Sequence, residues 1–379
     1  MTFAVWAAAL YCGIATLLHF VSIAIAVVRC RAPARHLTPP ADAPAVTLVQ
    51  PVCGVDNHVE TTLRSSFALD YPRYELIFCV ASAKDPVVPL VRALIAGHPA
   101  VRARLLIGDE RISSNPKLNN CYKGWLAAAH GWIVLADSNV LMPRDYIQRL
   151  FAAWRPDTGL VSAPPVGSRP NGFWAGLECV FLNTYQARWQ YAADTVGLGF
   201  AQGKTLFWRR ADLDATGGPR ALAAELAEDA ASTKIVRAAG RRVRLVDGPF
   251  AQPLGRRSLA DVWGRQARWA KLRRASFGHF YMLEATAGGA LPLAAAAFVA
   301  AATDAPVPAY LAFVATLWYG GEMLLAAAAG WHLPLMFPLQ AVLRDLMLPA
   351  LWIEGWRDRG LVWRGNAISV DDDKQVEAA

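Results

Sequence analysis

Near the N-terminus lies an apolar stretch long enough to cross a membrane. From Val5 to Val28, 24 consecutive residues include no Asp, Glu, Lys or Arg. A helix of this length is about 36 Å long, and a bilayer core is about 30 Å thick. The basic residues follow the stretch, at Arg29, Arg31 and Arg35, whereas a cleaved signal peptide carries them before it. The positive-inside rule therefore predicts an uncleaved anchor whose C-terminal flank lies in the cytoplasm.

A second apolar block follows near the C-terminus. Ala285–Thr303 carries no charge, and Ala305–Leu343 is interrupted only by Glu322. We predict two spans here. A third segment, Leu333–Ile353, contains three prolines and two charges, so interfacial, re-entrant and spanning placements all stay open. Glu322 is either a functional residue, as ionisable groups in such segments often are, or a carboxylate that reaches lipid headgroups.

The composition agrees with a chain that partly faces lipid. The sequence has 379 residues, of which 55% are hydrophobic and only 18% are charged, whereas soluble domains have about 25% charged residues. The net charge is +8, and the segment Arg256–Arg274, with seven basic residues and one acid, supplies +6 of it. Such local basicity suits a membrane surface and an anionic substrate, and we expect no nucleic-acid partner. The cysteines and histidines lack the spacing of a zinc site or of a disulfide framework.

The part of the chain between the apolar blocks alternates between strand and helix patterns. We predict strands at Val46–Val52, Tyr74–Ala81, Val101–Ile107, Gly131–Asp137 and Gly159–Ala163. We predict helices at Val59–Ala68, Pro86–Gly97, Asn119–His130 and Pro143–Trp154. Continuously apolar strands that alternate with helices are typical of an α/β fold with an open, mostly parallel sheet covered on both faces. The predicted domains are an anchor (1–29), a cytoplasmic α/β domain (30–279), C-terminal transmembrane or interfacial helices (280–356) and a polar tail (357–379).

Two acidic residues end predicted strands, where open α/β sheets bind ligands. Asp85 follows the Tyr74–Ala81 strand, and Asp137 ends the Gly131–Asp137 strand. Asp85 precedes Pro86, so a helix-capping role is as good an explanation for it as a ligand-binding role. Asp137 is the stronger candidate, and its carboxylate suits Mg²⁺ or Mn²⁺ between diphosphate oxygens.

Three further segments carry candidate residues. Glu228-Asp229 lies in a helical stretch, where neighbouring side chains point in different directions, so we expect at most one of the two at a given site. Arg265 and Arg268 share a helix face, with Trp269 beside them, and this arrangement suits a diphosphate or a membrane flank. The glycine-rich loop 197–205 lacks the spacing of a P-loop, but its Gln202, Lys204 and Thr205 are candidate contacts for a donor or an acceptor.

Taken together, these residues resemble the ceramide glucosyltransferase family, glycosyltransferase family 21, which has the GT-A fold. The resemblance covers about residues 46–275 and extends to the flanking apolar segments. Its motifs, in order, are Gly54-Val55-Asp56, Leu69-Asp70-Tyr71-Pro72-Arg73-Tyr74-Glu75, Asp85-Pro86, Asn115-Pro116-Lys117-Leu118-Asn119-Asn120, Asp137-Ser138, Glu228-Asp229 and Arg265-xx-Arg268-Trp269.

The resemblance implies a role for each matched residue. Asp85 and Lys117 would bind the donor nucleotide, and Asp137 would bind its diphosphate together with the metal ion. Asp229 would be the general base that deprotonates the acceptor hydroxyl. Arg265, Arg268 and Trp269 would hold the diphosphate and shape the acceptor end of the site.

The function expected from this resemblance is an inverting, metal-dependent transfer of one hexose, glucose or N-acetylglucosamine, from a UDP-sugar to a lipid hydroxyl. Ceramide is the first expected acceptor and a hopanoid the second. The expected location is the inner (plasma) membrane, multi-pass, with the catalytic domain in the cytoplasm. Two alternatives stay open, a processive polysaccharide synthase and a non-catalytic lipid-binding scaffold, although Arg265 stands where processive synthases carry Gln.

Three positions depart from the family pattern. Gln50 and Cys53 stand where ceramide enzymes typically have lysines, and Gln186 stands at the position of the family's His. The departures leave the identity of the sugar and of the acceptor open, but not the chemistry.

Overall fold

The computed structural model describes residues 2–31, 36–357, 361–363 and 366–368, and the chain divides into two compact units. Among the described residues, the sheet unit comprises 36–165, 193–253, 361–363 and 366–368, and the helical unit comprises 2–31, 166–192 and 254–357. Residues 166–192 and 254–279, which the sequence analysis placed in the α/β domain, thus group with the terminal helices. Arg35 and most of the predicted polar tail lie outside the described residues.

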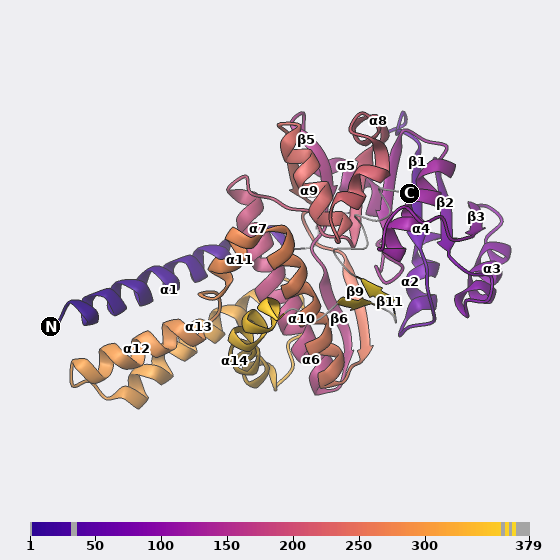
Figure 1. Cartoon of the computed structure of the whole chain (residues 1–379). Coiled ribbons are helices and arrows are strands. Elements are labelled where there is room, and N and C mark those ends of the chain that lie inside the picture. Colours follow the sequence, from indigo (N-terminus) through magenta and orange to yellow (C-terminus); the bar gives the residue numbers. More distant parts are fainter. Residues whose placement is uncertain (1, 32–35, 358–360, 364–365, 369–379) are drawn as a thin grey trace. The chain divides into compact units, whose positions relative to one another are not determined.

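The sheet unit is built on a seven-stranded mixed sheet (Figure 1). Its strands, in spatial order, are β3 (Arg102–Ile107), β2 (Tyr74–Val80), β1 (Val46–Pro51), β4 (Trp132–Ala136), β7 (Thr205–Arg209), β5 (Thr158–Ser162) and β8 (Arg242–Leu245). β1 to β4 run parallel to one another, β7 runs antiparallel to both of its neighbours, and β5 and β8 are parallel. The predicted open, mostly parallel sheet is confirmed, and its five predicted strands correspond to β1 to β5.

Apolar side chains are buried on both faces of this sheet. Leu48 and its partner Val134 belong to one buried cluster, whereas the next pair, Val49 and Leu135, belongs to another. Successive side chains of a strand point to opposite faces, so the two clusters form separate layers of the core. This is why the strands read as continuously apolar instead of alternating.

Helices and one 3₁₀ helix cover the two faces. They are α2 (Val59–Ser66), α3 (Val87–Gly97), α4 (Pro116–Ala127), α5 (Tyr146–Ala153), α8 (Arg210–Asp214), η2 (Gly218–Ala224) and α9 (Glu228–Ala238). α4 approaches β1 so closely that a Cβ added at Gly124 would lie 2.3 Å from Cγ1 of Val49. Two short strands, β10 (Leu361–Trp363) and β11 (Asn366–Ile368), pair antiparallel.

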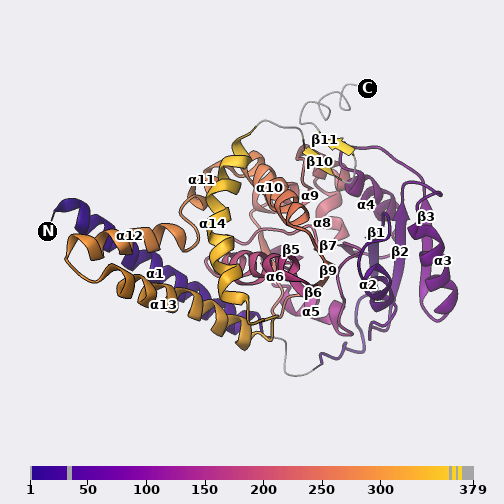
Figure 2. The same ribbon diagram turned by 90° about the horizontal axis from the view of Figure 1, so that it is seen from below.

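The helical unit combines the N-terminal segment with two later segments, 166–192 and 254–357 (Figure 2). Its helices are α1 (Phe3–Arg29), α6 (Phe173–Val180), the π-helix η1 (Phe181–Ala187), α7 (Arg188–Thr195, up to residue 192), α10 (Leu259–Ser276), α11 (Gly278–Glu284), α12 (Ala290–Ala302), α13 (Val307–Ala328) and α14 (Phe337–Trp356). Strand β6 (Val166–Asn171) pairs with β9 (Ala251–Arg256), which enters this unit at Leu254.

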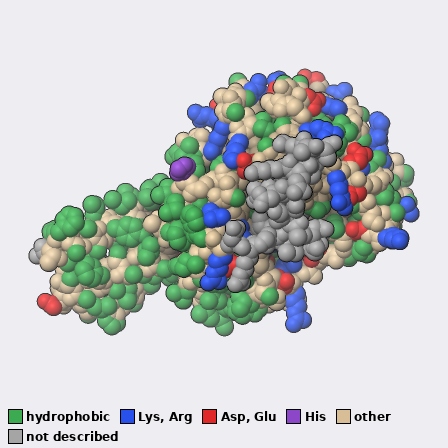
Figure 3. Space-filling view, in the orientation of Figure 1, with side chains coloured by type: hydrophobic (Ala, Val, Ile, Leu, Met, Phe, Trp, Pro, Cys, Tyr) green, Lys and Arg blue, Asp and Glu red, His purple; other side chains and the backbone are tan. Residues whose placement is uncertain are grey.

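Two helices in the described part of the chain are long and apolar enough to cross a membrane, α1 and α13. α12 has 13 residues, fewer than the roughly 20 that a spanning helix needs, so it does not match the first of the two spans predicted in the C-terminal block. Hydrophobic side chains cover the surface of α1, α12 and α13 (Figure 3). Among them Phe3 is 89% exposed and Leu324 is 70% exposed. Such a continuous apolar surface is unusual for a protein surrounded by water.

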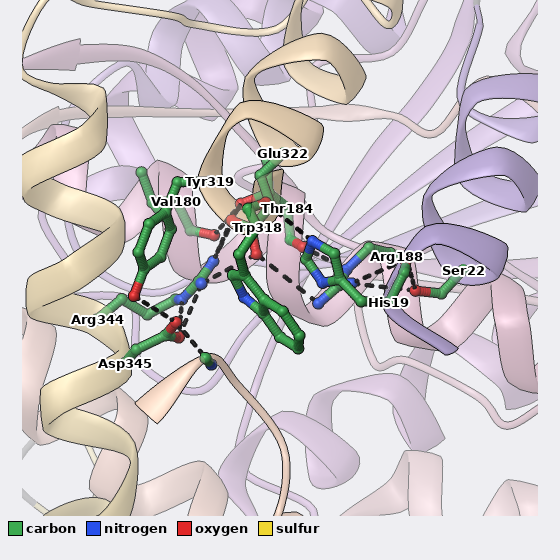
Figure 4. A network of polar contacts seen from close by, with 11 residues as sticks. His19, Ser22, Val180, Thr184, Arg188, Trp318, Tyr319, Glu322, Arg344 and Asp345 are labelled. Carbon is green, nitrogen blue, oxygen red and sulfur yellow. Dashed lines mark hydrogen bonds and ion pairs between the residues drawn. The ribbon is translucent and has the colours of Figure 1, made fainter. Parts of the chain in front are cut away.

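A buried polar network joins the helices of this unit (Figure 4). Arg344 of α14 forms ion pairs with Glu322 of α13 over 2.7 Å and with its neighbour Asp345 over 2.8 Å. Arg188 of α7 donates to Nδ1 of His19 on α1 over 2.7 Å, and Nε2 of His19 lies 2.9 Å from a carbonyl oxygen of α13. The side chain of Glu322 is fully buried, so the suggestion that it reaches lipid headgroups is wrong. Its carboxylate is neutralised inside the protein.

Candidate functional site

Three chain segments meet at the end of β4 in the sheet unit. Asp137 directly follows β4, Lys117 lies in the first turn of α4, and Gly203 and Lys204 precede β7. The backbone N–H of Asp137 donates to the carbonyl oxygen of Lys204 over 3.1 Å and so continues the pairing of β4 with β7. The sheet itself therefore places Lys204 opposite Asp137.

Lys117 is the centre of this cluster. Its Nζ lies 2.6 Å from Oδ1 of Asp137, 2.6 Å from Oε1 of Glu228 and 2.5 Å from the carbonyl oxygen of Gly203. The start of α4 positions it, because Asn115 is the N-cap and accepts from the backbone N–H of Lys117 over 3.0 Å. Asn115 also donates to Oε2 of Glu228 over 2.9 Å. The predicted donor-site lysine thus joins α4, β4 and α9.

A second lysine contacts the other oxygen of Asp137. Nζ of Lys204 lies 2.7 Å from Oδ2 of Asp137 and 3.1 Å from Oδ1 of Asn139. Two side-chain oxygens, spaced two residues apart after β4, therefore converge on one cationic group. Hard oxygens of this kind are also the ligands that Mg²⁺ and Mn²⁺ prefer.

Glu228 and Asp229 both take part in the site, at the start of α9. Glu228 pairs with Lys117, while Oδ2 of Asp229 accepts from the backbone N–H of Gly203 over 2.9 Å. The expectation that at most one of these carboxylates faces the site is therefore wrong. Gly203 passes between them, and a Cβ there would lie 2.7 Å from Oε1 of Glu228 and 3.4 Å from Oδ2 of Asp229. The loop reaches both carboxylates because it has no side chain at this point.

The charges in the cluster move the pKa values of the two aspartates in opposite directions. Burial by itself raises the pKa of Asp137, but the ammonium groups of Lys117 and Lys204 outweigh it and hold the pKa well below the ordinary value. Burial and the neighbouring Glu228 carboxylate raise the pKa of Asp229 to about 6. The Asp137 carboxylate therefore stays ionised at neutral pH, whereas Asp229 gains and loses a proton near neutral pH, as a general base must.

Asp85 lies at the end of β2 and holds a neighbouring loop. Its Oδ1 accepts from the backbone N–H of Gly54, after β1, and from that of Val87, in the first turn of α3, over 2.9 Å each. Asp85 thus bonds the first backbone N–H of α3, although the N-cap residue of this helix is Pro86. Within the described part of the chain, Asp85 forms no hydrogen bond or ion pair with Lys117, Asp137 or Asp229.

The predicted diphosphate residues lie on α10, in the helical unit. The helix begins with a capping box in which Ser258 and Asp261 bond each other's backbone N–H groups. Nη1 of Arg265 lies 2.5 Å from Oε1 of the buried Glu178 on α6. The ring of Trp269 lies 5.9 Å from the Arg265 guanidinium and packs against the cluster around Leu254. Arg268 is half-buried on the same helix. The contacts of Arg265 and Trp269 described above all lie within the helical unit.

Gln186 lies beside a small cavity in the helical unit. It donates from Nε2 to Oε1 of Gln266 over 2.8 Å, and Oε1 of Gln186 and Nε2 of Gln266 are buried without a hydrogen-bond partner. The cavity has a volume of about 20 Å³. This space has room for about one water molecule and is too small for a lipid head group.

Sequence reasoning did not single out Asn115, Asn139 or Gly203, and it named Lys204 only as a loop contact. A weak signal existed for Asn139, because Asp137-Ser138-Asn139 places two oxygen-bearing side chains two residues apart at a strand end. No spacing rule relates Gly203 to Asp229 or Lys204 to Asp137. The pairing of β4 with β7 brings Lys204 to Asp137, and Gly203 precedes Lys204 in the loop that contacts Asp229.

The mixed sheet and the cluster at the end of β4 define a glycosyltransferase fold of the GT-A type. The mannosyltransferase PcManGT from Pyrobaculum calidifontis, solved in complex with GDP-Man and Mn²⁺, has the same fold, with a TM-score of 0.53 and 20% identity over 94% of this chain and 99% of that chain. The family profile "Glycosyl transferase family 21" matches residues 14–376. The chain belongs to glycosyl transferase family 21.

Two relatives from Caenorhabditis elegans match over long stretches. Ceramide glucosyltransferase 1 is 26% identical over 277 residues, which is 73% of this chain and 59% of that protein. Ceramide glucosyltransferase 3 is 26% identical over 335 residues, which is 86% of this chain and 72% of that protein. The chain therefore spans about three fifths of one of these relatives and nearly three quarters of the other.

Proposed function

We propose that this chain is a membrane-bound, inverting glycosyltransferase that transfers a single hexose from a UDP-sugar to a lipid hydroxyl. The observation that carries the proposal is the cluster of Lys117, Asp137, Glu228 and Asp229 in a member of this family. It offers what a direct displacement needs, a base with a pKa near neutrality and cationic groups for a leaving diphosphate. The names of the relatives favour glucose as the sugar and ceramide as the acceptor. N-acetylglucosamine and a hopanoid are the second choices.

In the proposed reaction, Asp229 takes the proton of the acceptor hydroxyl as its oxygen attacks the anomeric carbon of the sugar. The bond from that carbon to the diphosphate breaks, and UDP leaves with both bonding electrons. The Gly203 N–H group keeps the Asp229 carboxylate in one orientation. Lys117 and Lys204 carry positive charge toward the diphosphate, while Asp85 fixes the Gly54 loop beside the nucleotide. Arg265, Arg268 and Trp269 are proposed to contact the diphosphate and the acceptor.

A divalent cation, Mg²⁺ or Mn²⁺, is part of the proposal. The donor set fits one, because Asp137 and Asn139 turn two oxygens toward a single cationic group. The described residues contain no group of three or more His, Cys, Asp or Glu side chains placed to hold a metal ion, so diphosphate oxygens and water would supply the other ligands. When bound, the ion neutralises charge on the leaving diphosphate.

The acceptor is proposed to arrive from a membrane. α1 and α13 are long and apolar enough to span one, and their exposed faces are hydrophobic. The basic residues after α1 and along α10 favour a cytoplasmic location for the sheet unit and a multi-pass arrangement in the inner membrane.

Transfer assays separate this proposal from its alternatives. Purified enzyme with UDP-glucose and ceramide should release UDP and form one glycolipid product, and Asp229→Ala should abolish release while UDP binding persists. A ladder of products would indicate a processive synthase. Absence of transfer to any lipid by the wild-type protein, despite normal folding, would favour a lipid-binding scaffold.

A further inference from the structure

Lys204 occupies the place where a cation bound by Asp137 and Asn139 would lie. Its backbone is fixed opposite Asp137 by the pairing of β4 with β7, and its Nζ contacts Oδ2 of Asp137 and Oδ1 of Asn139. The side chain is only 15% exposed. A divalent ion that used the same two oxygens would have to displace this ammonium group.

Lys117 is a poor candidate for displacement. Its Nζ contacts Asp137, Glu228 and the Gly203 carbonyl, and the carboxylate of Glu228 would be left buried beside Asp137 if Lys117 withdrew. Removal of one partner of a buried ion pair is costly because the other charge stays behind. Lys204 contacts the carboxylate of Asp137 and the amide oxygen of Asn139, and Asp137 keeps Lys117 as a cationic partner when Lys204 withdraws.

The charge balance gives Lys204 a function when no metal ion is present. Asp137, Glu228 and Asp229 face two ammonium groups, so without Lys204 and without a metal ion only the ammonium group of Lys117 would offset three carboxylates where the diphosphate binds. Lysine is a compact cation with three N–H donors and binds phosphate as a point charge. While its ammonium group stays bound to Asp137, Lys204 can direct one of its N–H groups to diphosphate oxygens.

We propose that Lys204 and a divalent cation are alternative occupants of the Asp137–Asn139 oxygen pair, so that the chain binds a nucleoside diphosphate with or without the metal ion. This inference rests on the proposed function, because it assumes that the diphosphate of the donor binds at Asp137. Lys204 takes the cation position in the metal-free state, and it turns to the diphosphate when a divalent ion enters.

The test measures UDP binding by calorimetry on the full-length protein in detergent, once with EDTA and once with MnCl₂. Wild type should lose no more than about tenfold in affinity when Mn²⁺ is removed, whereas Lys204→Met should lose about 100-fold, as expected for a charge-assisted contact. Binding by Lys204→Met should return with Mn²⁺, which also shows that the variant is folded. Lys234→Met, which removes a lysine paired with Glu225 at the surface, should behave as wild type.

A second readout follows the ion itself. Electron paramagnetic resonance of Mn²⁺ without nucleotide should show tighter Mn²⁺ binding by Lys204→Met than by wild type, because the competing ammonium group is gone. The inference is overturned if wild type loses UDP binding in EDTA as completely as Lys204→Met, or if Mn²⁺ affinity is equal in both. Failure to bind UDP in either buffer would overturn the proposed donor as well. UDP binding that follows this pattern without sugar transfer would overturn only the proposed function.

Discussion

The backbone N–H of Gly203 donates to Oδ2 of Asp229 over 2.9 Å, while Oδ1 of the same carboxylate accepts from the N–H of Ala230 over 2.8 Å. Both oxygens are therefore oriented before any substrate arrives. We expect Asp229→Asn to keep one of these two contacts with its amide oxygen and to lose the other, because the amide NH2 group cannot accept, and to lose the base. Transfer should fall by about 10²- to 10⁴-fold, the usual contribution of a general base.

The measurement is the rate of UDP release from UDP-glucose with ceramide, together with calorimetric binding of UDP. Glu225→Gln is the matched control, because Glu225 pairs with Lys234 outside the cluster. Transfer by Asp229→Asn at the wild-type rate would show that another group takes the proton.

The rate of transfer should rise with pH through about 6 and then level off. Burial and the Glu228 carboxylate raise the pKa of Asp229 to about 6, and only the ionised carboxylate accepts a proton. A profile of kcat/KM between pH 4.5 and 8 checks this expectation. A profile that is flat across this range would contradict the assignment of Asp229 as base.

The same pKa has a consequence for stability. The pKa of Asp229 lies above the ordinary value of 3.8, so between these two pH values the folded state binds more protons than the unfolded state. The contribution of Asp229 to the free energy of unfolding therefore falls as pH rises from about 4 to about 6. Asp229→Asn should remove this fall, so the variant should gain stability relative to wild type at pH 7 but not at pH 4. Denaturant unfolding at both pH values measures the difference.

Lys117→Met should destabilise the sheet unit by about 3–5 kcal/mol, because it leaves Asp137 and Glu228 partly buried without their shared cation. The double variant Lys117→Met/Glu228→Gln should be less destabilised, since one of the uncompensated charges is gone. Thermal unfolding of both proteins tests the argument. Equal loss of stability in the single and double variants would mean that the charges are not the cause.

Arg344→Met should cost more stability than Glu322→Gln. The first change leaves the carboxylates of Glu322 and Asp345 buried without their guanidinium, at a cost of about 3–5 kcal/mol, whereas the second keeps the Arg344–Asp345 pair. Leu346→Ala is the matched control on the same helix, because Leu346 is 65% exposed. Thermal unfolding in detergent gives the order, and the reverse order would show that Glu322 carries the network.

Gly124→Ala should lower the free energy of unfolding by about 1–3 kcal/mol, because the new Cβ would overlap Val49 in the packing of α4 on β1. Gly97→Ala, in α3, meets no atom within 4 Å and should be neutral or slightly stabilising. Denaturant titration of the two variants separates the packing effect from helix propensity. Equal stabilities would show that α4 moves away from β1 without cost.

Much of the sheet unit follows from the sequence because its strands are buried on both faces. Val46–Pro51, Tyr74–Val80 and Trp132–Ala136 read as largely apolar runs between helical patterns, and each became a parallel strand. The carboxylate of Asp137 at a strand end follows from the same pattern. The boundaries of α12 do not follow from the sequence, because the residues of this helix and those of the loop before it are equally apolar.

Local pattern by itself determined the class of fold, the apolar helices at both ends and the acidic residues at the strand ends, because each depends on neighbours within a few residues. Tertiary structure alone decided that Lys204 and Lys117 neutralise Asp137 and that Gly203 reaches Asp229, because these contacts cross 67, 20 and 26 residues of sequence. It also decided that Glu322 pairs with Arg344 inside the helical unit. The physical reason is that an ionisable side chain takes its charge state and its role from groups that only chain folding brings within a few ångströms.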